Sequence, residues 1–245
     1  MLTDILIAAL ALWFGGVLKG ATGAGAPIIA VPVMAMLFGV ELAVVIFVVP
    51  SLLTNIWQGW RFRTHQRPPK FTLGLALSGA AGAAFGSYLL ATVAPQLLLL
   101  AVAVVVIAYI AFRLAKPNWV LDAAIANRIL WPVGFVAGSL QGSTGVSAPV
   151  SVTFLNAMQV TRPVFIATIS VFFFAMATVQ IPVLYGLGLM DGQRLLLGLA
   201  AVIPLLAGMP FGAWLAARLS RQTFDRVILM LLAVIAARLI WQALV

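Results

Sequence analysis

Two short stretches, rich in glycine, hydroxyl residues and proline, hold most of the groups that could bind a ligand. They are GVLKGATGAGAPI, residues 16–28, and GSLQGSTGVSAPV, residues 138–150, which align without gaps. A helix has to stop and restart within each stretch, because glycine continues a helix poorly and proline suits the first turn of a new one. The restart presents backbone N–H groups at the positive end of a helix dipole, which favours a bound anion.

The candidate substrate-binding residues are those of these two turns. They are Lys19, Gly20, Thr22, Gly23, Gly25, Gln141, Gly142, Ser143, Thr144, Gly145 and Ser147. The hydroxyl and amide groups add neutral donors, and the lysine adds a full positive charge. Two such turns facing one another would enclose a site for a small anion.

Some of these features have a structural explanation as well. Glycines spaced Gly-x3-Gly let helices pack closely, and we expect this role for 82/86 and 208/212. Lys19 either contacts the ligand or extends to the membrane interface as an orientation signal. Three polar residues in apolar segments either line the path or bridge helices; they are Asn55, Gln58 and Gln180. Glu41 is a candidate for coupling transport to protons.

The composition indicates that membrane-spanning segments position the groups of the two turns. The 245 residues are 64% hydrophobic and 8% charged, with a mean hydropathy of +1.18, whereas soluble chains have about 25% charged residues. At about 20 apolar residues per crossing, the length allows about ten membrane spans. Without cysteine and with one histidine, disulfides, thiolate metal sites and multi-histidine centres are excluded. We expect no metal or cofactor.

Long uncharged stretches between clusters of charge define the expected spans, which should be helices because lipid cannot satisfy open backbone. We expect them at about 3–18, 26–40, 41–60, 71–91, 95–115, 127–141, 148–160, 163–185, 194–217 and 224–244. The arms on either side of the first turn, 3–18 and 26–40, would each be about 22–24 Å long at 1.5 Å per residue, short of the roughly 30 Å membrane core. Their partners in the second half, 127–141 and 148–160, are no longer than these. Both turns are therefore predicted to lie inside the membrane.

Basic residues predict the orientation. Arg61, Arg63, Arg67 and Lys70 lie between the third and fourth spans, and connections of the opposite parity carry almost no charge. Since basic connections face the cytoplasm, both termini are predicted outside the cytoplasm. The start lacks the basic region of a signal peptide and is expected to be a retained span. The net charge of +9 then needs no nucleic-acid partner, and the oligomeric state is not predicted.

The chain also contains an internal repeat. Besides the two turns, GAAFGSYLLATVAPQ (82–96) matches GMPFGAWLAARLSRQ (208–222) in the same order. The predicted repeats are 1–122 and 123–245, with five segments each, and an odd number of segments inverts the second repeat relative to the first. The expected fold is an all-α polytopic membrane protein with about ten segments, in two inverted five-segment repeats with broken, re-entrant helices, as in many secondary transporters.

The two turns resemble those of the TauE/SafE family, the sulfite-exporter type. The matching motifs are GGVLKGATGAGAPIIAVP and GFVAGSLQGSTGVSAP, and the resemblance in length, hydropathy and duplication covers the whole chain. It implies transport of sulfite, sulfonates, sulfoacetate or thiosulfate across the cytoplasmic membrane, often outward. The positions that correspond to the family motif are 20–27 and 142–149.

The expected function is therefore a secondary transporter for a small sulfur-containing anion, working by alternating access and coupled to protons or sodium. A P-loop for ATP-driven pumping is absent. A passive anion channel of the same fold is an alternative. A second alternative, an intramembrane hydrolase using Ser143, lacks an obvious base because His65, the one histidine, is expected in a cytoplasmic connection.

Overall fold

The computed structural model describes residues 2–116 and 119–218. This part of the chain consists of nine α-helices and one short 3-10 helix, η1, with no strand. The helices are α1 Leu2–Thr22, α2 Ala26–Phe38, α3 Val40–Arg61, η1 Arg63–His65, α4 Pro69–Thr92, α5 Pro95–Ala115, α6 Ala123–Thr144, α7 Ala148–Ala157, α8 Arg162–Gly186 and α9 Gly192–Ala216. The tenth predicted span, 224–244, lies outside the described residues.

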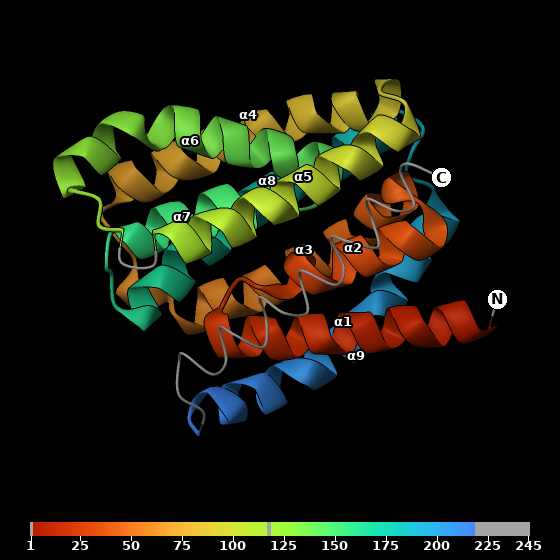
Figure 1. The fold of residues 1–245 in the computed structure, drawn as a ribbon, viewed down its shortest axis with the longest axis horizontal. Helices are drawn as coiled ribbons and strands as arrows, with labels where there is room; N and C mark the ends of the chain where they lie inside the picture. The colour runs from red at the N-terminus through yellow and green to blue at the C-terminus, as the bar shows by residue number, and fades with distance from the viewer. Residues whose placement is uncertain (1, 117–118, 219–245) are drawn as a thin grey trace.

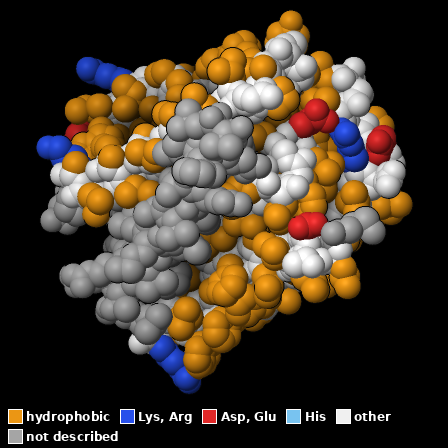
Figure 2. All heavy atoms as spheres, turned by 45° about the vertical axis from the view of Figure 1, so that its right-hand side comes forward, with side chains coloured by type: hydrophobic (Ala, Val, Ile, Leu, Met, Phe, Trp, Pro, Cys, Tyr) orange, Lys and Arg blue, Asp and Glu red, His pale blue; other side chains and the backbone are white. Residues whose placement is uncertain are grey.

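Seven of the described helices are long and apolar enough to cross a membrane, and the two shorter ones, α2 and α7, follow the glycine-rich turns. Their length and composition confirm the prediction of an all-α polytopic membrane protein. Hydrophobic side chains cover much of the face shown in Figure 2, and its charged side chains lie mainly toward the edges. Such a surface is suited to lipid rather than to water.

The lengths of two predicted arms were wrong. Helix α1 continues to Thr22 and α6 starts at Ala123 and continues to Thr144, so these helices have 21 and 22 residues rather than ending at 18 and 141. Each is long enough to span the membrane, and only α2 and α7, with 13 and 10 residues, are short. Gly20 therefore lies inside a helix, although glycine costs about 1 kcal/mol relative to alanine in a helix interior.

Close packing of helix backbones explains why glycine is tolerated there. A Cβ at Gly16 or Gly20 of α1 would collide with backbone oxygens of α9, and a Cβ at Gly208 or Gly212 of α9 would collide with backbone oxygens of α1. Helices α4 and α6 pack in the same way, because a Cβ at any of four further glycines would collide with a backbone oxygen of the other helix. These glycines are Gly82, Gly86, Gly138 and Gly142. The predicted packing role of the Gly-x3-Gly pairs is confirmed.

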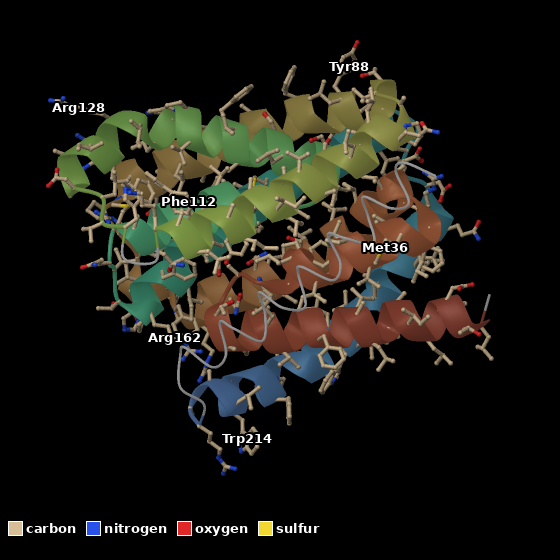
Figure 3. All side chains as sticks on the ribbon, viewed as in Figure 1. Met36, Tyr88, Phe112, Arg128, Arg162 and Trp214 are labelled. Carbon is tan, nitrogen blue, oxygen red and sulfur yellow. The ribbon has the colours of Figure 1, made fainter. Side chains whose placement is uncertain are left out.

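The two broken-helix hairpins enter the molecule from opposite ends. Helix α1 starts at the end marked N in Figure 1, whereas α6 starts at the other end, where Arg128 is labelled in Figure 3. Helices α3 and α8 pack against each other between these two hairpins. This arrangement brings both turns into the interior, where the site has to be sought.

Candidate functional site

The two turns have the same backbone geometry. Gly23 and Gly145 follow α1 and α6 with φ of 93° and 72°, a left-handed conformation that glycine adopts with little strain. The Gly23 N–H donates to the Lys19 carbonyl at 2.6 Å, and the Gly145 N–H donates to the Gln141 carbonyl at 2.9 Å. Each helix therefore ends in a left-handed glycine cap, at positions that are equivalent in the two aligned stretches.

The threonines before these glycines build the turns. The Thr22 hydroxyl donates to the carbonyl four residues earlier at 2.8 Å and accepts from the Ala24 N–H at 3.4 Å. Thr144 makes the same pair of bonds, at 2.7 Å and, with the Val146 N–H, at 3.3 Å. Both threonines were predicted to contact a ligand, but here their hydroxyl groups are used within the turn.

The helices that follow the turns begin without a side-chain cap. Gly25 is the N-cap residue of α2 and Ser147 that of α7, and neither helix start receives a hydrogen bond from a side chain. Such helix starts keep partial positive charge from their N–H groups. At the first turn this end faces a cavity, because Ala24, Ala26 and Pro27 line it.

Lys19 brings its amino group, which is a cation when protonated, to the same cavity. Its side chain is only 3% exposed, so the ammonium stays inside the protein and does not extend to an interface. Nζ donates to Oδ1 of Asn55 at 2.8 Å and lies 5.9 Å from the centroid of the Phe173 ring. Among the residues that the structure describes, Lys19 forms no salt bridge.

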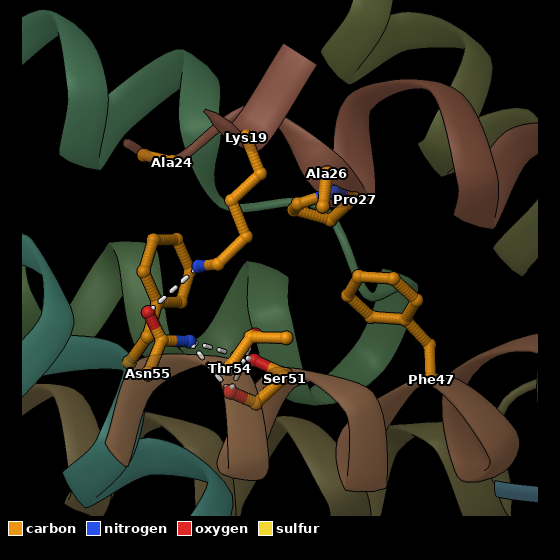
Figure 4. Close-up of a pocket in the computed structure, with 9 residues that line it drawn as sticks. Lys19, Ala24, Ala26, Pro27, Phe47, Ser51, Thr54 and Asn55 are labelled. Carbon is orange, nitrogen blue, oxygen red and sulfur yellow. Dashed lines mark hydrogen bonds between the residues drawn. The ribbon is translucent and has the colours of Figure 1, made fainter. Parts of the chain in front are cut away.

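Asn55 is held in position by its own helix. Its Nδ2 donates to the Ser51 carbonyl at 2.7 Å and to the Ser51 hydroxyl at 3.3 Å, which leaves Oδ1 directed toward Lys19 (Figure 4). This network assigns the orientation of the amide. The Lys19 ammonium, with three donors, thus has one polar acceptor in the described part of the chain.

The cavity lies between the first turn, α3 and α8. Its lining consists of Lys19, Ala24, Ala26, Pro27, Phe47, Ser51, Thr54, Asn55 and Phe173. The cavity is small, with room for about one water molecule. A larger ligand would require the surrounding helices to move apart.

The second turn contributes no residue to this cavity. Gln141 Oε1 instead accepts from the Ser147 hydroxyl at 2.9 Å, and the Ser143 hydroxyl donates to the Ser139 carbonyl at 2.7 Å. Any Cβ at Gly145 would meet Val31 of α2, so the second turn packs against the first repeat. The polar groups of the second turn are largely paired with one another.

The three predicted pathway residues have different surroundings. Asn55 lines the cavity, and Gln180 Nε2 donates to the Gly142 carbonyl at 3.4 Å. Gln58 is buried, and its Oε1 has no hydrogen-bond partner among the described residues; the Ser170 hydroxyl of α8 is also buried without one. A bridging role therefore fits Gln180, whereas Asn55 belongs to the site.

Glu41 lies away from the cavity. It is in the first turn of α3, and its Oε1 lies 2.8 Å from Nη1 of Arg194 in the first turn of α9. The two side chains are 45% and 31% exposed. An ion pair this exposed typically contributes about 0–1 kcal/mol.

Sequence reasoning missed four residues of the cavity, Phe47, Ser51, Thr54 and Phe173. A signal existed for Ser51, because it lies one helical turn before Asn55, on the same face of the helix. Nothing in the sequence alone predicts that the two phenylalanines, from different repeats, line the same cavity as Lys19.

Arg162 does not line the cavity but contacts the end of the helix that carries Lys19. It starts α8, and its Nη2 donates to the carbonyls of Gly20 at 3.2 Å and Ala21 at 3.0 Å. A cation at a helix C-terminus interacts favourably with the helix dipole. Arg162 therefore ties the second repeat to the end of α1, next to Lys19.

The hydrolase alternative gains no support from this geometry. The Ser143 hydroxyl bonds to a backbone carbonyl within its own helix. His65 is exposed in η1, where its ring contacts the hydroxyl of Thr64. A serine nucleophile needs a base within hydrogen-bond reach.

A bundle of apolar helices, with a cation buried beside the start of a broken helix, defines a polytopic membrane protein of the transporter class. The model of the family described as sulfite exporter TauE/SafE matches residues 7–239. The chain belongs to this family, which is a family of transporters. No curated protein and no solved structure matches the chain significantly.

Proposed function

We propose that the protein is a secondary transporter that exports a small sulfur-containing anion, of the sulfite, sulfonate, sulfoacetate or thiosulfate class, across the cytoplasmic membrane. The sulfur chemistry and the direction rest on the family, whose description is a sulfite exporter. The inference that the substrate is an anion rests on the residues of the site itself. The proposed binding residues are Lys19, Ser51 and Asn55, together with the backbone at the start of α2.

One observation carries this proposal: a lysine that is 3% exposed lines a cavity inside a membrane protein. Ionisable groups inside membrane proteins are costly, and they generally mark pathways or ligand sites. The uncapped start of α2 faces the same cavity and adds about half a positive charge. Both features stabilise a negatively charged ligand.

The small size of the cavity favours a carrier over an open channel. With room for about one water molecule, the site has to open before an anion of several atoms can enter. In the proposed mechanism, the repeats 1–122 and 123–245 are inverted with respect to each other and move so that the site opens to one side at a time. In this proposal the basic connections face the cytoplasm, and the N-terminus lies on the outer side.

Counterflow in proteoliposomes tests this function. Vesicles that contain the full chain are loaded with unlabelled sulfite and placed in a trace of radioactive sulfite. A carrier will accumulate the label transiently and with saturation. A channel will instead give large currents without counterflow, and the absence of any anion flux, compared with protein-free vesicles, would refute the proposal.

A further inference from the structure

One face of α3 carries a stripe of polar side chains that continues beyond the cavity. Ser51, Asn55 and Gln58 are spaced i, i+4 and i+7, so they lie on the same face of the helix. Ser51 and Asn55 line the cavity, whereas Gln58 is buried about one turn nearer the end of the helix at Arg61. The polar stripe therefore leads from the cavity toward the basic connection that follows α3.

Helix α8 packs against α3 at this part of the stripe. Phe173 of α8 lines the cavity. Ser170, one turn earlier, lies beside the residue that follows Gln58, because a Cβ at Gly59 would be 3.7 Å from the Ser170 Cβ. Since α3 belongs to the first repeat and α8 to the second, the proposed movement of the repeats would separate the two helices here.

Two polar atoms at this place have no hydrogen-bond partner among the described residues. They are Oε1 of Gln58 and Oγ of Ser170, and the two side chains are only 3% and 0% exposed. A buried polar group without a partner costs about 1–3 kcal/mol, and native structures retain few of them. Apolar side chains would serve helix packing better, so these groups need another use, which a passing polar ligand supplies.

The distance from the cavity to the end of α3 is short, and basic residues lie at that end. Asn55 and Arg61 are six positions apart, which is about 9 Å along the helix at 1.5 Å per residue. Arg61 and Arg63 are both exposed. Positive charge at an entrance attracts anions and raises their local concentration.

We propose that the anion passes between α3 and α8, past Gln58 and Ser170, on its way between the cavity and the cytoplasm. This inference rests on the proposed function and adds the route on the cytoplasmic side of the site. The amide of Gln58 and the hydroxyl of Ser170 both contain hydrogen-bond donors. While the helices are apart, these donors replace part of the hydration shell of the anion.

Single cysteines test this route, since the chain has no cysteine of its own. The reagent is 2-sulfonatoethyl methanethiosulfonate, which does not cross membranes and carries a sulfonate like the proposed substrates. It is added to inverted vesicles, whose outer surface is the cytoplasmic face of the membrane. We expect Gln58→Cys and Ser170→Cys to react at least ten times faster than the control Thr168→Cys, and methanesulfonate to slow both reactions.

Thr168 is a matched control for Ser170 on the same helix. Its side chain is 1% exposed, and its hydroxyl also has no partner among the described residues. At 3.6 residues per turn, however, it lies about 200° around α8 from Ser170. A faster reaction at Ser170 therefore reports the position of the route and not merely an unpaired hydroxyl group.

Uptake of methanesulfonate into the same vesicles shows which variants are folded, and either route variant is sufficient for the test. A transporting variant that does not react, or reacts no faster than Thr168→Cys, would overturn the route and leave the proposed transport function intact. Reaction only in intact cells, where the reagent reaches the opposite face, would also overturn it. If the wild type transports no anion at all, the proposed function fails and the inference fails with it.

Discussion

The ammonium of Lys19, in the last turn of α1, lies 2.8 Å from the amide oxygen of Asn55 in the C-terminal half of α3. This bond joins a helix that ends inside the molecule to one that is long enough to cross the membrane. It pairs a cation with a neutral acceptor, so the charge is oriented without being neutralised. A built-in carboxylate at the same place would instead supply the missing counter-charge.

Asn55→Asp tests this difference. The new carboxylate should pair with Lys19, raise the midpoint of thermal unfolding in detergent and weaken anion binding at least tenfold, which is about 1.4 kcal/mol. The matched control is Gln58→Glu, which places a carboxylate on the same helix but outside the lining of the cavity. It should lower the unfolding midpoint, because a buried charge without a partner is strongly destabilising. Unchanged anion affinity in Asn55→Asp would contradict the assigned site.

The glycine caps should be sensitive to the smallest substitution. Gly23→Ala and Gly145→Ala force a Cβ into left-handed backbone, at a cost of about 1–2 kcal/mol, and the new methyl group also meets Ile166 or Val31. Thermal unfolding should show a lower midpoint for both variants. Gly186→Ala is the control, because a Cβ there meets open space; a similar loss in the control would argue against the caps as the cause.

The contact between α1 and α9 provides another prediction. In Gly212→Ala the added Cβ collides with the backbone carbonyl of Val17, which no side-chain rotation can relieve. Separation of the helices should cost about 1–3 kcal/mol, measured as a lower unfolding midpoint and as loss of a cysteine cross-link engineered between α1 and α9. Gly192→Ala, in open space at the start of α9, should match the wild type. A stable Gly212→Leu variant would be incompatible with this packing.

Glu41 was a candidate for proton coupling, but its ion pair with Arg194 gives it a structural role, which can be tested separately. Because the pair is partly exposed, a double-mutant cycle with Glu41→Gln and Arg194→Gln should give a coupling energy of about 0–1 kcal/mol. Transport by Glu41→Gln should keep the pH profile of the wild type. Loss of pH dependence in Glu41→Gln but not in Arg194→Gln would support proton coupling by Glu41 instead.

The sequence predicted the features that depend on local chemistry. Apolar runs predicted the helices, and the aligned stretches predicted two equivalent turns, which the structure has at Gly23 and Gly145. Prediction from the sequence failed where tertiary contacts override the low helix propensity of glycine. Gly20 and Gly142 continue their helices because each lies against the backbone of another helix, and single-sequence propensity contains no information about such a partner.

The site itself was predicted only in part. The two turns looked alike in sequence and are alike in backbone, but their side chains differ in what they contact. Gln141 is satisfied by Ser147, six residues away, whereas Lys19 reaches Asn55 on another helix. That difference depends on which residue of α3 lies opposite the end of α1, so the location of the cavity at one turn could not be derived from the repeat.

The most direct test of the account is to locate a bound anion. Selenite, an electron-rich analogue of sulfite, can be added to the full chain in a crystal and identified by the anomalous scattering of selenium. The account predicts a selenium peak in the cavity between the first turn and α3, with an oxygen within hydrogen-bond distance of Lys19 Nζ. A peak only at the second turn, beside Gln141 and Ser147, would contradict it.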